Sequence, residues 1–261
     1  MIPRVLIIAG SDSGGGAGIQ ADIKTVTMLG GYAATAVTAV TVQNTLGVAG
    51  IHSIPPGIVE GQIKAVLDDI GADAIKIGML GDAVTIEAVA RALAGVSLPI
   101  VLDPVMVAKG GARLLQDDAV AALVRLLLPR ATLLTPNVPE LEVLSGINVT
   151  DEADMLLAAQ ELLAAGPGAV LAKGGHMEGE RVVDWLVTHN SQLRFEAPRV
   201  STRHNHGTGC TLSSAIAAGL AAGLPLAVAV ERARAYLLSA LTAAPGLGQG
   251  HGPIGHNFAL L

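Results

Sequence analysis

Short apolar runs alternate with amphipathic helical patterns along most of this chain, and this alternation limits its fold more than any other feature. The runs suited to buried strands are Val5–Ala9, Ala36–Val42, Ala74–Ile77, Ile100–Leu102, Thr132–Leu134 and Ala169–Ala172. Strands that alternate with helices form right-handed βαβ units, which build a mainly parallel sheet with helices on both faces. The sequence therefore predicts an α/β fold in three layers, helix, sheet and helix.

Helical patterns separate these runs, with apolar residues three or four positions apart. The patterns are Ile19, Ile23 and Val26; Val59, Ile63, Val66, Leu67 and Ile70; Val120, Leu123, Val124 and Leu127; and Met155, Leu156, Ala159, Leu162 and Leu163.

Two segments, Gly47–Pro56 and Arg181–Phe195, do not fit the alternation of strands and helices and are expected to be edge strands or a small flap over the site. No linker or repeat interrupts the chain, so residues 1–261 are predicted to form one domain. Within it, Gly246–Gly255 is expected to be a surface loop.

Composition excludes several classes of protein. Apolar residues make up 51% of the chain and charged residues 15%, which argues against disorder. The net charge is −6 and the basic residues are scattered, so no nucleic-acid partner is expected. A single cysteine cannot form an internal disulfide, and the first apolar run is too short for a signal segment. We therefore expect a cytoplasmic protein.

The segment Thr211–Val230 contains no charged residue and resembles a membrane span in that respect. However, its apolar content is mostly alanine, and Gly219, Gly223 and Pro225 interrupt it. Two packed helices joined near Gly223 explain the segment better, so no membrane partner is expected.

The sequence His206–Cys210 carries the strongest indication of chemistry. Gly207 and Gly209 flank Thr208, and Cys210 lies where an apolar helix should begin. Backbone N–H groups at a helix start attract anions, and a thiol placed there is expected to lose its proton more easily than a free one. An anion-binding loop beside a reactive group indicates phosphoryl transfer.

Oxygen-bearing side chains follow two of the predicted strands. Asp103 comes directly after one strand, and Asn137 and Glu140 follow another. Asn137 is suited to cap the next helix, and Glu140, three residues on, is suited to take part in that cap. This interpretation explains Asn137 well and leaves Glu140 free for another role. Because the carboxyl ends of parallel strands meet at one edge of a sheet, Asp103 and Glu140 are candidate ligands for magnesium.

Other strand ends carry candidates that also have simpler explanations. Lys173 precedes two glycines and is placed to meet a phosphate, or else is a surface lysine in a turn. The Gln43 amide suits the edge of a heterocycle or is a turn former. Met79 is a pocket wall or core filler. Asp22 is a site residue or merely complements the dipole of its helix.

Three familiar motifs are excluded. The glycine-rich segment after the first strand, Gly10–Gly18, fits neither a Walker A loop nor the dinucleotide fingerprint. A match to that fingerprint at Gly250–Gly255 follows no predicted strand, so we attribute it to chance. His204 and His206 without further ligands are weak evidence for a metal pair.

Taken in order, these residues resemble the hydroxymethylpyrimidine/phosphomethylpyrimidine kinases of thiamine biosynthesis, in the ribokinase-like clan. The matching pieces are Ala9–Asp12 with Gly14–Asp22, Gln43–Thr45, Lys76–Leu80, Leu102–Met106, Thr135–Glu140, Lys173–His176, His206–Thr211 and Gly252–Pro253. The resemblance implies a three-layer ribokinase-like fold and phosphorylation of 4-amino-5-hydroxymethyl-2-methylpyrimidine, and then of its monophosphate, with ATP and Mg²⁺. A homodimer is also expected, because dimers are common in the clan.

The resemblance also implies roles for residues at matching positions. The pyrimidine site would be lined by Gly10, Asp22, Gln43, Met79 and Val105. Gly207, Thr208 and Gly209 would form an anion hole, with Cys210 facing the reacting hydroxyl and Lys173 assisting. Asn137 and Glu140 match the metal-linked N-x-x-E motif of the clan. Most ribokinase-like sugar kinases have aspartate at the position of Cys210, so the cysteine favours this branch.

Alternative functions remain at this point. A pyridoxal kinase of the same clan also binds an aromatic heterocycle with a hydroxymethyl group, although Gln43 better matches an aminopyrimidine. A non-catalytic pyrimidine sensor would keep the pocket, but the combination of Cys210, Lys173 and Glu140 argues against it. A dinucleotide-dependent oxidoreductase is the most distant alternative, because it lacks a placed fingerprint.

Overall fold

All strands of the protein belong to one sheet. The computed structural model describes residues 1–107, 111 and 114–260, and its nine-stranded sheet has the order β3-β2-β1-β4-β5-β6-β7-β8-β9. The parallel strands are β1 (Arg4–Asp12), β2 (Tyr32–Asn44), β4 (Ala74–Ile77), β5 (Ile100–Leu102), β6 (Leu133–Leu134) and β7 (Ala169–Lys173). The antiparallel pairings involve β3 (Gly47–Ser53), β8 (Arg181–Thr188) and β9 (Gln192–Pro198).

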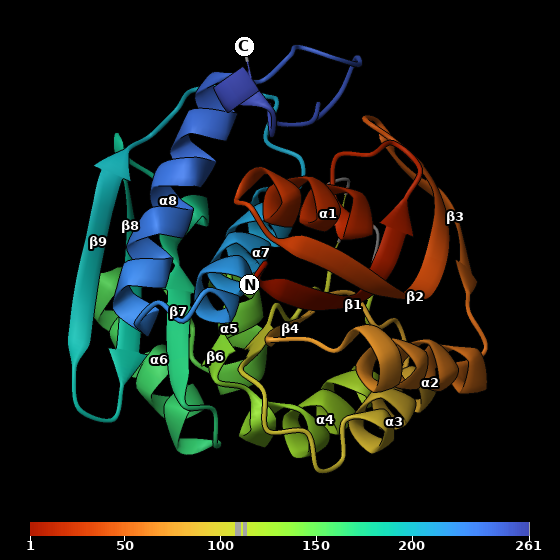
Figure 1. Cartoon of the computed structure of the whole chain (residues 1–261). Coiled ribbons are helices and arrows are strands. Elements are labelled where there is room, and N and C mark those ends of the chain that lie inside the picture. Colours follow the sequence, from red (N-terminus) through yellow and green to blue (C-terminus); the bar gives the residue numbers. More distant parts are fainter. Residues whose placement is uncertain (108–110, 112–113, 261) are drawn as a thin grey trace.

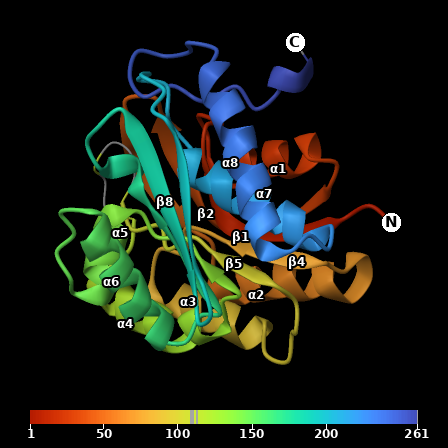
Figure 2. The same ribbon diagram turned by 90° about the vertical axis from the view of Figure 1, so that its left-hand side faces the viewer.

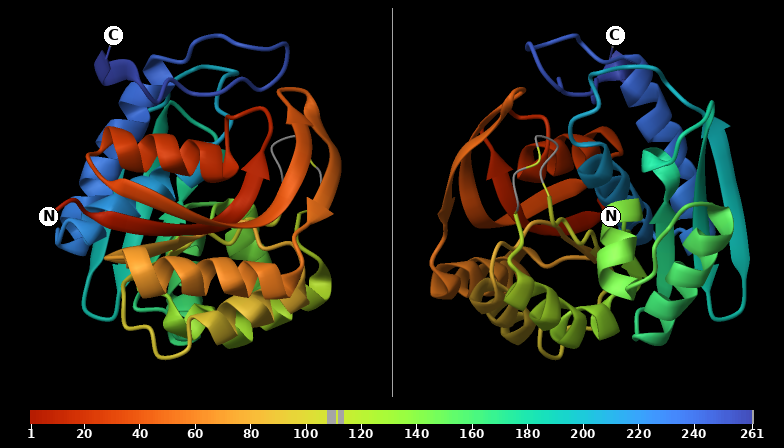
Figure 3. Two further views of the ribbon diagram at one scale, coloured as in Figure 1. Left: turned by 45° about the vertical axis from the view of Figure 1, so that its right-hand side comes forward. Right: turned by 180° about the vertical axis from the view of Figure 1, so that it is seen from behind.

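The predicted strands are all present, and the two segments that did not fit the alternation supply the ends of the sheet. β3 pairs antiparallel with β2, and β8 and β9 form a hairpin that extends the sheet from β7. Figure 3 shows β3 and β9 at opposite ends of the sheet. β3 and β9 are therefore edge strands, one of the two possibilities that the sequence offered, whereas β8 lies inside the sheet between β7 and β9. The single-domain prediction for residues 1–261 is compatible with this one sheet and stays a prediction.

Helices cover both faces of the sheet, which confirms the three-layer α/β/α prediction (Figures 1 and 2). One face is covered by α2 (Pro56–Ala65), which continues as a π-helical turn (Val66–Ile70), and by α3 (Ala83–Ala92), α4 (Asp117–Leu126), α5 (Val138–Ser145) and α6 (Glu152–Ala164). The other face is covered by α1 (Gly18–Met28), α7 (Thr208–Ala221) and α8 (Leu226–Thr242). Short 3-10 turns lie at Leu128–Arg130, Gly174–His176 and Phe258–Leu260.

The continuous apolar character of β1 follows from its place between two cores. Leu6 and Ile8 belong to the core under α2–α6, whereas Val5, Ile7 and Ala9 belong to the core under α1, α7 and α8. Successive side chains of a strand point to opposite faces, so a strand buried on both faces has no polar alternation. This is why short, uniformly apolar runs predicted the strands well.

The uncharged segment Thr211–Val230 forms most of α7 and the start of α8, as the sequence predicted. A Cβ added to Gly219 would lie 2.9 Å from the Cβ of Ala229, so the two helices approach closely at this glycine. Within the described residues, none of the helices reaches the length and apolar character that a membrane crossing needs.

The expectation of a surface loop at Gly246–Gly255 is wrong for the second half of that segment. Gly252, Ile254 and Gly255 are buried. Two backbone hydrogen bonds join this segment to distant parts of the chain. His251 N–H donates to the Thr45 carbonyl (2.8 Å), and His206 N–H donates to the Gly252 carbonyl (3.1 Å). Backbone hydrogen bonds to distant segments, which local composition does not reveal, explain the burial.

The close approach of α7 and α8 gives a testable prediction. Gly219→Val inserts a branched side chain where even a methyl group is crowded, so we expect the free energy of unfolding to fall by about 1–3 kcal/mol. Ala235→Val, at an exposed position of α8, is the matched control and should change stability far less. Urea denaturation of both variants checks this, and equal stabilities would contradict the packing described here.

Candidate active site

The first turn of α7 directs backbone N–H groups toward the carboxyl edge of the sheet. Gly207, before the helix, has a φ of +83°, and no side chain among the described residues caps the helix start. The first hydrogen bond of the helix runs from Thr211 N–H to the Gly207 carbonyl (2.9 Å), so the N–H groups between them have no partner within the helix. A Cβ on Gly207 would collide with the Gly16 carbonyl oxygen. Only glycine allows this turn to lie against the loop after β1.

Lys173, at the end of β7, points its ammonium at Asp103 after β5. The Lys173 Nζ lies 2.9 Å from Asp103 Oδ1, which also accepts from the Thr135 hydroxyl at 3.2 Å. The Lys173 side chain is only 12% exposed, which excludes the surface-lysine interpretation. A Cβ added to Gly209 would lie 3.4 Å from the Lys173 Nζ. The ammonium is therefore next to the uncapped turn of α7.

Both members of this pair remain charged. Burial by itself would raise the pKa of Asp103, but Lys173 and Lys76 hold it below its ordinary value. Burial would likewise lower the pKa of Lys173, but the Asp103 and Glu140 carboxylates hold it above its ordinary value. The site therefore keeps a fixed positive charge beside the uncapped turn.

The hairpin β8–β9 braces the chain immediately after Lys173. Asp184 of β8 accepts a hydrogen bond from Gly174 N–H at 2.9 Å and forms an ion pair with Arg234 of α8. The Arg234 guanidinium lies 5.7 Å from the ring centroid of Phe195 of β9. The hairpin thus fixes the turn that directly follows Lys173.

Asn137 and Glu140 form a capping box at the start of α5. Glu140 N–H donates to the Asn137 side chain (3.0 Å), and Asn137 N–H donates to Glu140 Oε2 (2.8 Å). The alternative that Glu140 takes part in the cap is therefore confirmed, and the expectation that the cap leaves it free is wrong for one of its two oxygens. Burial, reinforced by the charge of Asp103, raises the pKa of Glu140 to about 7, although Lys173 opposes this.

The fit of this region to a divalent cation rests on Asp103 and Glu140. One ammonium, that of Lys173, faces both carboxylates. Burial is the main cause of the raised pKa of Glu140, and a hard cation bound beside its oxygens would stabilise the ionised carboxylate. Among the described residues, no group of three or more His, Cys, Asp or Glu side chains has the arrangement of a metal site. Two carboxylates would leave most positions around a bound Mg²⁺ to other ligands, which this ion tolerates well.

A second lysine–carboxylate pair is buried beneath α7. Lys76 of β4 is fully buried, and its Nζ lies 2.9 Å from Asp22 Oδ2. Ser214 of α7 donates to Asp22 Oδ1 at 2.6 Å. Burial would lower the pKa of Lys76, but Asp22, together with further negative charge that includes Asp103, holds that pKa above its ordinary value. Asp22 lies beyond the first turn of α1, so the interpretation as a dipole partner is wrong.

Cys210 lies in the first turn of α7, as predicted, but its thiol is not activated in this structure. Burial raises the pKa of Cys210 to about 11, and the nearby Lys76 charge and a hydrogen bond from Gly18 N–H offset burial only in part. The expectation of an easily lost proton is therefore wrong. Desolvation of the thiolate exceeds the favourable field of the helix start.

The residues implied to line a pyrimidine site lie around the end of β1. A Cβ added to Gly10 would lie 3.1 Å from the Met79 sulfur, so these two residues are in contact. Met79 is 9% exposed, and Val105 is half-buried after Asp103. Gln43, at the end of β2, is half-buried and contacts His206 directly before the uncapped turn. Asp22 is the member of this set with no exposed surface.

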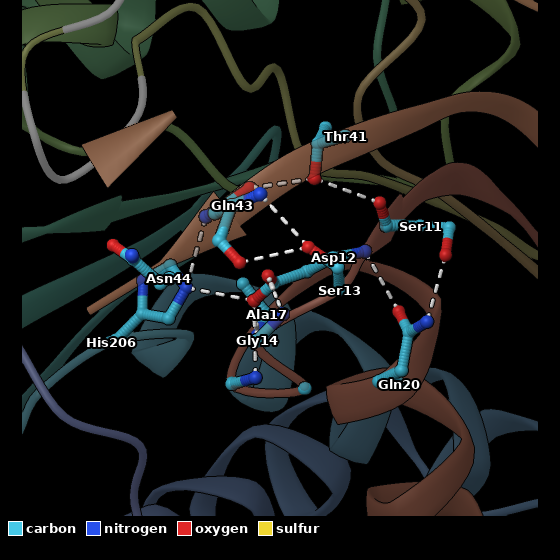
Figure 4. Close-up of polar contacts among 12 residues, drawn as sticks. Ser11, Asp12, Ser13, Gly14, Ala17, Gln20, Thr41, Gln43, Asn44 and His206 are labelled. Carbon is cyan, nitrogen blue, oxygen red and sulfur yellow. Dashed lines mark hydrogen bonds and ion pairs between the residues drawn. The ribbon is translucent and has the colours of Figure 1, made fainter. Parts of the chain in front are cut away.

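Asp12 ties these segments together (Figure 4). Its Oδ1 accepts from Gly14 N–H (2.8 Å), and its Oδ2 accepts from Gly16 N–H (3.0 Å) and Ala17 N–H (2.8 Å). The same Oδ2 lies 2.9 Å from His206 Nε2. One carboxylate thus shapes the glycine-rich loop and fastens it to the residue before Gly207.

Sequence reasoning missed Asp12, Lys76 and Ser214, and assigned no role to His206. A lysine within an apolar strand was an available signal for Lys76, because an unpaired buried ammonium is very costly. Asp12 ends a strand and binds backbone N–H groups among the next five residues, so it also offered a local signal. Ser214 and His206 offered none, since their partners lie far along the chain.

The comparisons with known proteins bear on this site. The family model described as phosphomethylpyrimidine kinase matches residues 12–255. This chain belongs to the phosphomethylpyrimidine kinase family. A hydroxymethylpyrimidine/phosphomethylpyrimidine kinase from Streptomyces coelicolor is 49% identical over 99% of this chain and 96% of its own length. A thiamine biosynthesis bifunctional protein from Geobacter sulfurreducens is 51% identical over 98% of this chain, which spans 52% of that relative.

Solved structures of similar proteins confirm the ribokinase-like α/β fold of this phosphomethylpyrimidine kinase family member. An ADP complex of Bacillus subtilis pyridoxal kinase has a TM-score of 0.93, 35% identity and full coverage of both chains. A phosphomethylpyrimidine kinase from Clostridium difficile has a TM-score of 0.81 and 40% identity over 91% of this chain and 98% of its own.

Glu140 gives a prediction about pH. Its pKa rises from an ordinary 4.5 to about 7 on folding, so the folded protein holds a proton that the unfolded chain releases. The protonated Glu140 side chain therefore adds to the free energy of unfolding at low pH. This contribution is lost as the pH rises from 4.5 to about 7. Glu140→Gln keeps the capping geometry but does not titrate. Relative to this variant, the wild type should lose about 2–3 kcal/mol of unfolding free energy across the interval. Urea denaturation of both proteins in the presence of a metal chelator measures this difference in unfolding free energy. A difference that does not change with pH would contradict the raised pKa of Glu140.

Proposed function

We propose that this chain transfers the γ-phosphoryl group of ATP to the hydroxymethyl oxygen of 4-amino-5-hydroxymethyl-2-methylpyrimidine, and then to the monophosphate so formed. The product is the diphosphate used in thiamine biosynthesis. The observation that carries the proposal is the uncapped glycine turn before α7, held beside the Lys173 ammonium. Membership of the phosphomethylpyrimidine kinase family and similarity to a kinase crystallised with ADP support it.

The phosphate is held by backbone and by one fixed charge. The N–H groups at Gly207, Thr208 and Gly209 surround the transferred phosphoryl group as an anion hole, and the helix dipole of α7 adds to the attraction. Lys173 neutralises charge that develops on the phosphoryl oxygens. Because the phosphoryl transition state is loose, such positioning supplies most of the catalysis.

Mg²⁺ would be held by Asp103 and Glu140, with Asn137 fixing Glu140 through the capping box. When bound, the ion neutralises phosphate charge and aligns the nucleotide. The carboxylate of Glu140, with its pKa near 7, loses its proton readily once a cation is beside it. The Lys173–Asp103 pair keeps Asp103 ionised before the nucleotide arrives.

The pyrimidine would lie between Gly10, Met79 and Val105, with its polar edge on Gln43. An amide offers a donor and an acceptor side by side, which matches an aminopyrimidine edge. Asp22 has no exposed surface, so we propose that it contributes through its ion pair with Lys76.

Cys210 would meet the substrate hydroxyl as a neutral thiol. With a pKa of about 11, the thiol is protonated at neutral pH and orients the hydroxyl by hydrogen bonding. As the new O–P bond forms, the bond between the γ-phosphorus and the ADP oxygen breaks, and the hydroxyl proton passes to an oxygen of the transferred phosphoryl group. The second transfer presents a phosphate oxygen, which carries its own charge and needs Cys210 less.

Replacement of Cys210 tests this role. Cys210→Ala should lower kcat for the first phosphorylation by about 10²-fold, because the hydroxyl loses its orientation, while the Kd for ATP is unchanged. Cys210→Ser keeps a hydrogen-bonding group and should retain most of the activity. The kcat of the wild type should not climb steadily toward pH 11, as it would for an essential thiolate. Unchanged turnover in the alanine variant would remove Cys210 from the mechanism.

Mass spectrometry of products formed from the hydroxymethylpyrimidine with Mg-ATP tests the proposed function. Products heavier by one and then two phosphoryl groups are expected. The main alternative is a pyridoxal kinase, favoured by the TM-score of 0.93 to such an enzyme. A larger kcat/KM for pyridoxal than for the pyrimidine would establish it. Absence of ADP release with either compound would indicate a sensor.

Three further expectations accompany the proposal: a homodimer, a cytoplasmic location and a single domain spanning residues 1–261. Light scattering of the purified protein tests the first, and a mass equal to one chain would overturn it. Limited proteolysis tests the third, since one domain without linkers should resist cleavage into stable fragments.

A further inference from the structure

His206 contacts two groups that the proposed mechanism uses separately. Its Nε2 lies 2.9 Å from Asp12 Oδ2 and 3.1 Å from the Gln43 side-chain amide (Figure 4). The other end of that amide lies 3.0 Å from the Thr41 hydroxyl, which is also 3.0 Å from the Ser11 carbonyl. The imidazole thus joins the loop after β1 to the end of β2.

The hydrogen on His206 Nε2 is fixed by Asp12. Burial would raise the pKa of Asp12, but His206 and the backbone N–H groups of Ala17 and Gly14 together hold it below its ordinary value. An ionised carboxylate only accepts hydrogen bonds, so His206 Nε2 must carry the hydrogen that faces it.

This hydrogen in turn fixes the Gln43 amide. An Nε2–H group has no lone pair to accept from an amide N–H, so the amide must turn its oxygen to His206. The structure places the amide nitrogen toward His206 and the amide oxygen toward the Thr41 hydroxyl. With the two ends exchanged, the nitrogen donates to the Thr41 hydroxyl, and the one hydrogen of that hydroxyl goes to the Ser11 carbonyl. The oxygen and nitrogen ends of an amide have the same shape, so these hydrogen bonds alone decide its orientation.

We propose that His206 is a specificity-determining positioning residue, which holds the Gln43 amide in a single orientation toward the ligand. This inference rests on the proposed function, in which Gln43 meets the edge of the pyrimidine. The edge of an aminopyrimidine presents an N–H donor and a ring-nitrogen acceptor in a fixed order. An amide fixed in the complementary order distinguishes it from a ring without the amino group, whereas an amide free to rotate accommodates both.

Two substitutions of similar polarity separate this role from a structural one. His206→Gln reaches as far as Nε2 and can still donate to Asp12, whereas the shorter His206→Asn cannot. The measured quantity is the ratio of kcat/KM for the hydroxymethylpyrimidine to that for its analogue without the 4-amino group. We expect His206→Asn to lower this ratio about tenfold, the contribution of one hydrogen bond, and His206→Gln to restore most of it.

The background variant Gln43→Ala and the control His256→Asn complete the experiment. If His206 acts through Gln43, adding His206→Asn to Gln43→Ala should leave the ratio unchanged. His256 contacts Thr211 in α7 at 2.9 Å, so its replacement should change both kcat/KM values by the same factor. Equal losses for both compounds in His206→Asn, or a lower ratio in the double variant than in Gln43→Ala alone, would overturn the inference. A wild type that phosphorylates neither compound would instead overturn the proposed function.

Discussion

Two buried lysine–carboxylate pairs beneath the first turn of α7 support everything else in the site. Lys76 with Asp22 and Lys173 with Asp103 each have a nitrogen–oxygen distance of 2.9 Å. Removing one partner from a buried pair leaves an uncompensated charge, which costs far more than the pair itself contributes. Ser214 and Ser213 of α7 reach the two aspartates, so the pairs also fix the helix over the sheet.

This arrangement places positive charge at the phosphate side of the site while keeping the thiol neutral. The Lys173 ammonium lies beside Gly209, whereas Cys210 is desolvated enough that its pKa rises to about 11. A helix start attracts anions through accessible N–H groups, but here it does not offset the cost of desolvating the thiolate of the half-buried Cys210. The same helix start therefore suits a bound phosphate and does not suit a thiolate.

Backbone approach links the pieces of the site. Gly207 lies against the Gly16 carbonyl, and Asp12 binds the loop that contains Gly16 as well as His206. A movement of the glycine-rich loop would therefore displace the anion-binding turn. The turn after Lys173 is held from another direction, by Asp184 and Arg234 at the far end of the sheet.

The sequence by itself determined the layered α/β fold, because strand and helix periodicity are local properties and the short apolar runs suit strands buried on both faces. It also located the strand-end residues Asp103 and Lys173, because parallel strands end at one edge. It did not reveal α3, although Asp82 caps that helix by accepting from Thr85 N–H. Only the tertiary structure decided the ionisation of Cys210 and Glu140, because a pKa depends on burial and on charges from other segments. The same holds for the pairs Lys76–Asp22 and His206–Asp12, whose members lie far apart in the sequence and are brought close by folding alone.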